Sequence, residues 1–419
     1  MIDPDNEIEE WEEGNNEGHG SLEVRRQEFI EIGDSVSLED PGENSTRLFR
    51  LDIEEQIDAA LTIRLDFEDE YDDADLFVDF NVERPSSVPE DRFKRRCFSA
   101  HATMNEMCQF HPVRKGTYFI MVHAWGSYSD ATLSVGIAEL PAELFDLDVS
   151  VVDEVTSSQN AVIMRVAERY ESMIGLGSYD ARVWLEADGC APGFPQLVEH
   201  YLDDIEVVIM VGSVDGEGGV VAMSGTCAIR HRIHDGWIGM PGIGAIVLDE
   251  ADIEGLESDG VFETVVMREM AKAMGFDPVL WNIHGFLKNP SSANEPEADA
   301  HMNAALVVAA FNAAGGENYT GAKVPLENGT VPGVSNRTWR ASVFGNEIMT
   351  PYLTGDTPPL SRITLEALYE VGYELDVTMA DPFTLSGMRT AGLKAYPSIG
   401  LATYRGSVIP VLISRRPVK

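Results

Sequence analysis

Apolar and polar residues alternate along the first third of the chain. Between residues 25 and 140, every second position is apolar in four short runs, at 61–67, 76–80, 118–122 and 133–137. Runs with a period of two, separated by clusters of Gly, Pro and Asp, are typical of antiparallel strands that bury one face. We therefore predict an antiparallel β-sandwich over residues 25–140.

The pattern changes near residue 141. Continuous apolar runs at 205–211 and 244–248 predict buried strands, and a further strand-like run lies at 408–413. Apolar residues at helical spacing predict helices at 157–174, 262–274, 303–312 and 364–369. Strands interleaved with helices indicate an α+β or α/β domain over residues 141–383, followed by an extension over 384–419.

Capping residues support these helices. Ser157 and Ser158 are candidate N-caps of the first helix, and Ser361 or Thr364 is a candidate N-cap of the last. Gly275 directly follows the second helix, where a left-handed residue commonly ends a helix.

The charge balance restricts the partners. The chain has 30 basic and 71 acidic residues, which gives a formal net charge of −41, and 44% of its residues are hydrophobic. Such a field repels phosphate, so we expect no nucleic-acid partner. Residues 1–24 are rich in acids without apolar periodicity and predict a disordered tail. No apolar run is long enough for a transmembrane helix, and the first residues lack the features of a signal peptide.

Four cysteines form two local pairs, Cys97 with Cys108 and Cys190 with Cys227. An even, pairwise count favours disulfides and an oxidising compartment, although four cysteines allow three connectivities and buried free thiols are the alternative. We therefore expect an extracellular or cell-surface protein.

One helical motif suggests catalytic chemistry. Zinc peptidases place two His four residues apart on one helix face, with a Glu between them as general base. The corresponding run here is Arg268-Glu-Met-Ala-Lys272, followed by Gly275. By itself, a Glu between two cations on a helix indicates a charged face rather than a catalytic site.

The segments around this helix resemble the leishmanolysin family of metzincin zinc metallopeptidases over residues 145–383. The similarity lies in the runs at 207–211, 215–219, 227–230, 244–249, 324–328, 338–350 and 360–368. The run Gly345-Asn-Glu-Ile-Met-Thr350 is the most specific of them. The resemblance implies a metzincin-type (zincin) α+β domain. Runs at 73–78, 116–122 and 131–137 likewise make the predicted sandwich similar to the bacterial pre-peptidase C-terminal domain.

The leishmanolysin resemblance also assigns roles to individual residues. It implies that Glu269 stands at the position of the general base and Met349 in the Met-turn beneath the metal. The zinc ligands would stand at Arg268, Lys272 and, directly before a Trp, at Thr338, and none of the three is His.

These replacements remove the zinc chemistry. Arg stays protonated at usable pH, and a charged Lys has no lone pair to donate. Without the ion, no bound water is acidified, and Glu269 has nothing to activate. We therefore expect no metal cofactor and an inactive relative of a secreted zinc metalloendopeptidase. We also expect Arg268 and Lys272 to pair with Glu269, Glu347 or another inward carboxylate, because burying both unpaired is costly.

Other residues offer a metal site less readily. His231, His234, His284 and His301 do not match ligand positions of the family, and we expect them to be surface or hydrogen-bonding residues. The acidic run at 68–75 could bind calcium, although a solvated loop is the simpler interpretation.

Three functions remain open. The preferred one is a silent homologue that keeps a cleft for a peptide or protein ligand. The second is an active zinc metalloendopeptidase with unrecognised ligands, or a ligand-substituted variant of one. The third is a surface adhesion module that binds through its β-sandwich.

Overall fold

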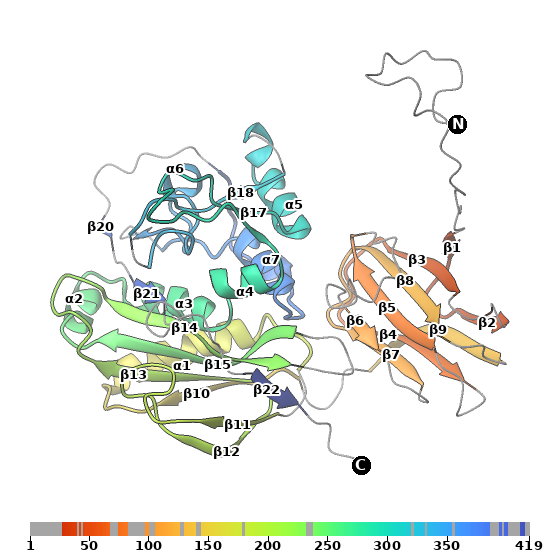
Figure 1. Cartoon of the computed structure of the whole chain (residues 1–419), viewed down its shortest axis with the longest axis horizontal. Helices are drawn as coiled ribbons and strands as arrows, with labels where there is room; N and C mark the ends of the chain where they lie inside the picture. The colour runs from red at the N-terminus through yellow and green to blue at the C-terminus, as the bar shows by residue number, and fades with distance from the viewer. Residues whose placement is uncertain are drawn as a thin grey trace.

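A computed structural model describes residues 27–39, 42, 45–67, 74–82, 97–99, 105–125, 130–139, 144–177, 181–231, 238–319, 322–331, 333–353, 357–385, 394–395, 398–400 and 411–414. The predicted acidic tail at 1–24 and residues 68–73 of the acidic run lie outside these ranges. The described residues form several sheets and few helices (Figure 1).

The N-terminal part consists of two sheets. One has the strand order β1 (Gln27–Phe29), β3 (Thr46–Ile53), β8 (Gly116–Ala124), β5 (Ala74–Phe80) and β6 (Cys97–Ser99). The other has the order β2 (Ser35–Glu39), β9 (Asp130–Ala138), β4 (Ala60–Phe67) and β7 (Glu106–Phe110). The four alternating runs fall in β4, β5, β8 and β9, as their period predicts. One pairing departs from the antiparallel expectation, because β1 runs parallel to β3.

Strand β5 is buried along its whole length, which its alternating sequence does not predict. Its inward residues join the main core, and Phe77 packs with Met121 on the opposite face. Asp75, the described end of the acidic run, is buried and accepts a hydrogen bond from Trp125 Nε1 at 2.6 Å. The alternation therefore locates this strand but understates how much of it is covered.

A third, eight-stranded sheet forms the base of the remaining chain. Its order is β10 (Leu147–Val151), β13 (Ile205–Gly212), β15 (Ile238–Asp249), β14 (Ala222–His231), β22 (Val411–Ser414), β11 (Ala181–Leu185) and β12 (Leu197–Leu202), with β21 (Ser398–Gly400) also paired to β14. Strands β10, β13 and β15 are parallel, and β14 is antiparallel to β15. The predicted strands at 205–211 and 244–248 lie within β13 and β15, whose apolar runs are buried.

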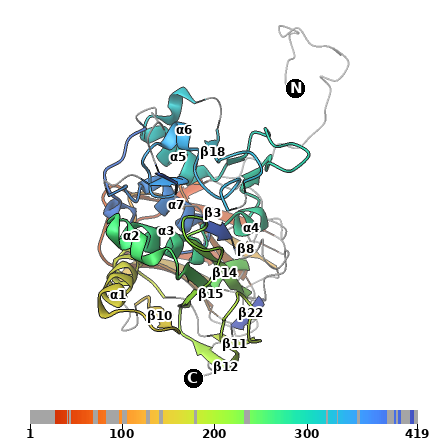
Figure 2. The ribbon, with the colours of Figure 1, turned by 90° about the vertical axis from the view of Figure 1, so that its left-hand side faces the viewer.

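Two helices cover one face of this sheet. Helix α1 (Ser157–Glu171) packs on α3 (Phe262–Ala273), and α3 packs on β14 and β15 (Figures 1 and 2). The Tyr170 hydroxyl donates to the Met267 carbonyl at 2.9 Å and joins the two helices. The predicted caps of α1 were wrong: Thr156 caps the helix, with Gln159 completing a capping box. Gly275 has a φ of +114°, which explains why α3 ends where predicted.

The chain beyond α3 contains α4 (Pro278–Ile283), α5 (Ala305–Ala313), α6 (Ala341–Phe344), α7 (Arg362–Glu370), a sheet of β16 (Leu287–Lys288), β17 (His301–Met302) and β18 (Val324–Pro325), and β19 (Tyr352–Leu353) paired with β20 (Lys394–Ala395). The helices α4 to α7, which follow α3, lie on the other side of that helix from the sheet (Figure 1). The short helix α2 (Ile253–Ser258) precedes α3. The helix predicted at 303–312 begins two residues later than expected, and Ser361 caps α7 through the Thr364 N–H.

Both predicted disulfides are present, Cys97–Cys108 between β6 and β7 and Cys190–Cys227 between the segment after β11 and β14. The described residues contain no helix long and apolar enough to span a membrane.

Candidate functional site

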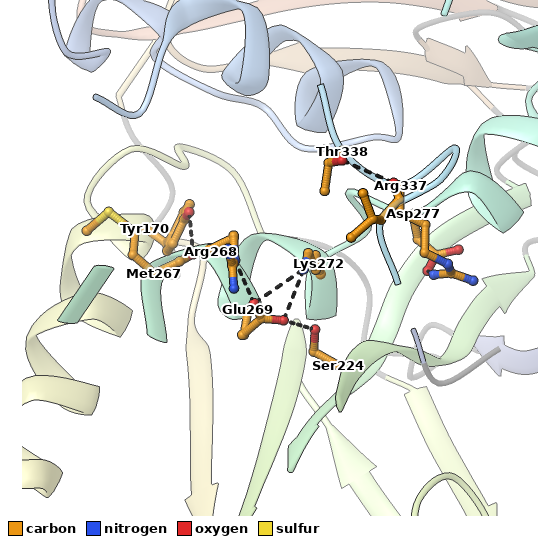
Figure 3. Close-up of polar contacts among 10 residues, drawn as sticks. Tyr170, Ser224, Met267, Arg268, Glu269, Lys272, Asp277, Arg337 and Thr338 are labelled. Carbon is orange, nitrogen blue, oxygen red and sulfur yellow. Dashed lines mark hydrogen bonds and ion pairs between the residues drawn. The ribbon is translucent and has the colours of Figure 1, made fainter. Parts of the chain in front are cut away.

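Helix α3 carries three neighbouring charges into the interior of the protein. Arg268 is 1% exposed, Glu269 0% and Lys272 6%. Arg268 Nε donates to Glu269 Oε1 at 2.8 Å, and Lys272 Nζ lies 3.3 Å from Oε1 and 3.2 Å from Oε2 of the same carboxylate (Figure 3). Every residue from 264 to 273 is buried, so α3 is a core helix beyond Glu263 in its first turn. The expected pairing of both cations with Glu269 is confirmed.

A fourth residue completes this cluster from the sheet. Ser224 of β14 is fully buried, and its hydroxyl donates to Glu269 Oε2 at 2.5 Å (Figure 3). The carboxylate therefore receives hydrogen bonds from Arg268, Lys272 and Ser224. We refer to these four residues as the ion-pair cluster.

The cluster sets the protonation state of Glu269. Burial alone raises the pKa of this carboxyl, but the charges of Lys272 and Arg268 and the Ser224 hydroxyl outweigh it and lower the pKa to about 2. Burial also lowers the pKa of Lys272, to about 8, against the opposing pull of Glu269. At neutral pH the carboxylate is ionised and is a weak base, because general bases work best with a pKa near the operating pH.

The segment containing Thr338 is tied to α3 by its neighbour. Arg337 forms an ion pair at 2.8 Å with Asp277, which lies just beyond the end of α3 (Figure 3). Thr338 is 2% exposed, and its hydroxyl donates to the Val334 carbonyl at 3.0 Å. Thr338 is thus a buried residue whose hydroxyl bonds within its own segment.

Trp339 links this segment to Met349. The Trp339 N–H donates to the Met349 carbonyl at 3.0 Å, and the indole Nε1 donates to Thr364 Oγ1 at 2.9 Å. The indole stacks on Phe344 and Trp281 and is fully buried. Met349 is fully buried as well.

Glu347 has partners of its own near the start of α7. Its Oε1 accepts from the hydroxyls of Thr364 at 2.5 Å and Ser361 at 2.7 Å, and its Oε2 accepts from the Met349 N–H at 2.6 Å. Burial raises its pKa to about 7, although these donors pull the value down. Glu347 therefore joins the Met349 segment to the N-terminus of α7.

The histidines named from the sequence fall into two groups. His284 stacks on Phe286 with ring centroids 5.6 Å apart, and His301 Nδ1 lies 2.6 Å from the Asp299 carbonyl. His234 and the side chain of His231 lie outside the described residues. Among the side chains that are described, no three His, Cys, Asp or Glu residues are arranged to hold a metal ion.

The comparison with protein families identifies the part of the chain that contains the cluster. The family model described as leishmanolysin matches residues 187–394. These residues are leishmanolysin-like. The match confirms the resemblance seen in the sequence and includes α3, Thr338 and Met349.

Other comparisons add little to the leishmanolysin match. No curated protein matches the chain. The pre-peptidase C-terminal domain of a collagenase from Bacillus anthracis is 12% identical over 26% of this chain and 95% of its own, with a TM-score of 0.22. A periplasmic inhibitor of g-type lysozyme from Aeromonas hydrophila, PliG, is 16% identical over 27% of this chain and 100% of its own, with a TM-score of 0.17. TM-scores this low carry no argument about function.

Leishmanolysin is a zinc-dependent family, and the residues at the implied ligand positions do not fit zinc. Zinc in proteins is held by Cys, His, Asp or Glu. Arg268 has no lone pair to offer, Lys272 is protonated beside Glu269, and the Thr338 hydroxyl is bonded to a carbonyl. Two adjacent positive charges would also repel a dication.

Ser224 and the Arg337–Asp277 ion pair are the site residues that sequence reasoning missed. Ser224 stands beside apolar residues in β14, but this strand also contains Thr226 and Arg230, so the sequence does not single it out. Arg337 and Asp277 are 60 residues apart and have no common motif.

Proposed function

We propose that this protein is a catalytically silent relative of leishmanolysin, in which an internal ion-pair cluster takes the place of the metal. The observation that carries the proposal is the carboxylate of Glu269, held between Arg268 and Lys272 with Ser224 as third donor. The general base of a zinc peptidase must meet a metal-bound water, whereas this carboxylate is fully buried and saturated with donors.

A binding role is the function that this arrangement supports best. Peptidases of this kind act on polypeptides, and a relative that keeps the scaffold without the metal can hold an extended chain without cutting it. The ion-pair cluster supports this role because it satisfies the charges of α3 internally, so the fold needs no metal. The ligand we propose is a peptide or protein segment.

The same proposal places the protein outside the cytoplasm. Two disulfides in the described residues support an oxidising compartment, since such bonds are rare in reducing ones. An extracellular or cell-surface location also agrees with the leishmanolysin match.

Metal content and peptidase activity of the full chain test the silent state. After dialysis against zinc-free buffer, we expect far less than about one zinc per chain by elemental analysis. We also expect no cleavage of carboxymethylated casein. About one zinc per chain, together with cleavage that Glu269→Gln abolishes, would overturn the proposal.

Casein also serves as the binding probe, because it offers many extended segments. We expect saturable binding of immobilised carboxymethylated casein to the full chain, with no loss of casein over hours. The matched reference is the triple variant Arg268→His, Lys272→His and Thr338→His, which restores a His set and should acquire zinc if it folds. Failure of the full chain to bind casein would remove the support for a polypeptide-binding role.

A further inference from the structure

One edge of β14 is covered by the C-terminal end of the chain. Strand β15 pairs with β14 from Ala222 to His231 and occupies one side of it. On the other side, β21 pairs in parallel with Ala222–Ser224, and β22 pairs in parallel with residues 229–231. Within the described residues, the C-terminal strands therefore complete a side of β14 that would otherwise be a sheet edge.

This covered edge adjoins the ion-pair cluster. Ser224 donates to Glu269 and is also the residue of β14 whose register partner is Gly400 of β21. The leishmanolysin match ends at residue 394, so both β21 and β22 lie beyond it. Gly400 of β21, from outside the matched segment, thus pairs directly with a residue of the cluster, and β22 pairs further along the same strand at residues 229–231.

Strand β22 is inserted between β14 and β11. Leu412 pairs with Arg230 of β14, and Ile413 pairs both with His231 of β14 and with Arg182 of β11. Among the described residues, three register pairs join β22 to β14 and two join it to β11. A strand with so few pairings opens at a small fraction of the free energy needed to unfold the whole domain.

The β11–β12 hairpin does not depend on β22 for its place. The Cys190–Cys227 disulfide connects the segment after β11 directly to β14. Val183 and Leu185 of β11 also share a hydrophobic core with Met210 of β13 and Val247 of β15. If β22 dissociates, the strands on either side of it, β14 and β11, therefore remain connected. We call the gap that β22 fills between these two strands the strand slot.

An open slot of this kind presents unpaired backbone N–H and C=O groups from two strands. Such groups accept an added strand through main-chain hydrogen bonds, with side chains giving specificity. The resident sequence, Val411-Leu-Ile-Ser414, has three apolar residues, of which Val411 and Ile413 are β-branched, and this indicates the chemistry that the slot accepts.

We propose that the slot between β14 and β11 is a strand-accepting site, in which an extended, apolar β-branched peptide replaces the chain's own β22. This inference deepens the proposed binding role, and its biological meaning rests on that role. The C-terminal strand acts as the resident occupant, and a ligand must compete with it for the slot.

Strand exchange in the full chain tests the proposal. The probe is a fluorescein-labelled synthetic peptide with the sequence of residues 406–416, measured by fluorescence anisotropy. The double variant Leu412→Pro/Ile413→Pro removes two N–H donors from the resident strand, and Leu412→Val/Ile413→Val is the matched control that keeps them. We expect the proline variant to bind the peptide at least about tenfold more tightly than the wild type, and the valine variant to bind as the wild type does.

A folded proline variant that binds no more tightly than the wild type would overturn the proposal. If the proline variant does not fold, hydrogen exchange on the unaltered chain decides. We expect β22 amides to exchange at least about tenfold faster than those of β15, through local opening. If β22 and β15 amides exchange at equal rates, both only through global unfolding, the proposal is also overturned.

The two proposals fail in different ways. Peptide exchange without casein binding would leave the strand slot standing and remove the general binding role. If casein binds equally well to the wild type and the proline variant, but no peptide exchange occurs, the general binding role stands and the strand slot is refuted.

Discussion

The ammonium of Lys272 lies 3.2 Å from Glu269 Oε2, one turn further along the same buried helix. The same carboxylate is 2.8 Å from Arg268 Nε. Within the cluster, one buried anion therefore lies between two buried cations. Interactions of this kind stabilise little relative to an apolar core, but removing a single partner is strongly destabilising.

Neutralising Glu269 should destabilise the protein severely. We expect Glu269→Gln to lower the free energy of unfolding by about 3–5 kcal/mol, because Arg268 and Lys272 then remain buried without their anion. Chemical denaturation measures the loss. Glu263→Gln on the same helix is the control, because Glu263 forms an exposed ion pair with Arg165. The denaturation midpoint of this variant should hardly differ from that of the wild type. Equal midpoints for the two variants would contradict the role of the cluster.

Glu347 should make stability depend on pH near neutrality. Its pKa is raised from 4.5 to about 7, so between these values the folded state binds more protons than the unfolded state. Glu347 therefore adds up to about 3 kcal/mol to the free energy of unfolding. This contribution is fully present below pH 4.5 and is lost as pH rises through 7. Denaturation curves of the wild type and Glu347→Gln from pH 4 to 8 measure it. The variant should have the flatter profile, and parallel profiles would refute the assignment.

Arg114 should couple the β-sandwich to the rest of the chain. Its Nη2 atom lies 2.6 Å from Glu366 of α7, with both side chains buried, and its guanidinium lies 4.2 Å from the centroid of the Tyr369 ring. Glu366 pairs with two cations, Arg114 and the more exposed Arg362, and Arg114→Met removes the buried one. We therefore expect this variant to lower the free energy of unfolding by about 3 kcal/mol. Calorimetry should then resolve two transitions where the wild type has one. Arg165→Met is the exposed control, and a single unshifted transition in Arg114→Met would argue against coupling.

The contact between α3 and β15 leaves no room for a methyl group at Gly244. A Cβ there would lie 2.6 Å from the Ala273 carbonyl oxygen and 2.8 Å from its Cβ. We expect Gly244→Ala to destabilise the protein by about 1–3 kcal/mol, because the helix must move away from the sheet. Gly212→Ala is the matched control in β13, with nothing within 4 Å of the added atom. If both variants melt together, α3 does not pack this closely.

The sequence by itself determined the elements and the chemical identity of the site. The period of two located β4, β5, β8 and β9, and the helical period with Gly275 located α3, because side-chain periodicity follows directly from backbone geometry. The motif around Glu269 already contained both of its ion-pair partners: Lys272, three residues further on, lies on the same helix face, and Arg268 is the adjacent residue.

Only the tertiary structure decided what surrounds those elements. Ser224 meets Glu269 from a strand 45 residues away, and the Arg337–Asp277 pair spans 60 residues, so no local pattern contains either contact. The strand-like run predicted at 408–413 falls partly outside the described residues, and its described end lies in β22 (Val411–Ser414), which pairs within the eight-stranded sheet. Strand pairing depends on which edges remain open once the rest of the sheet has formed, and that is a property of the assembled fold.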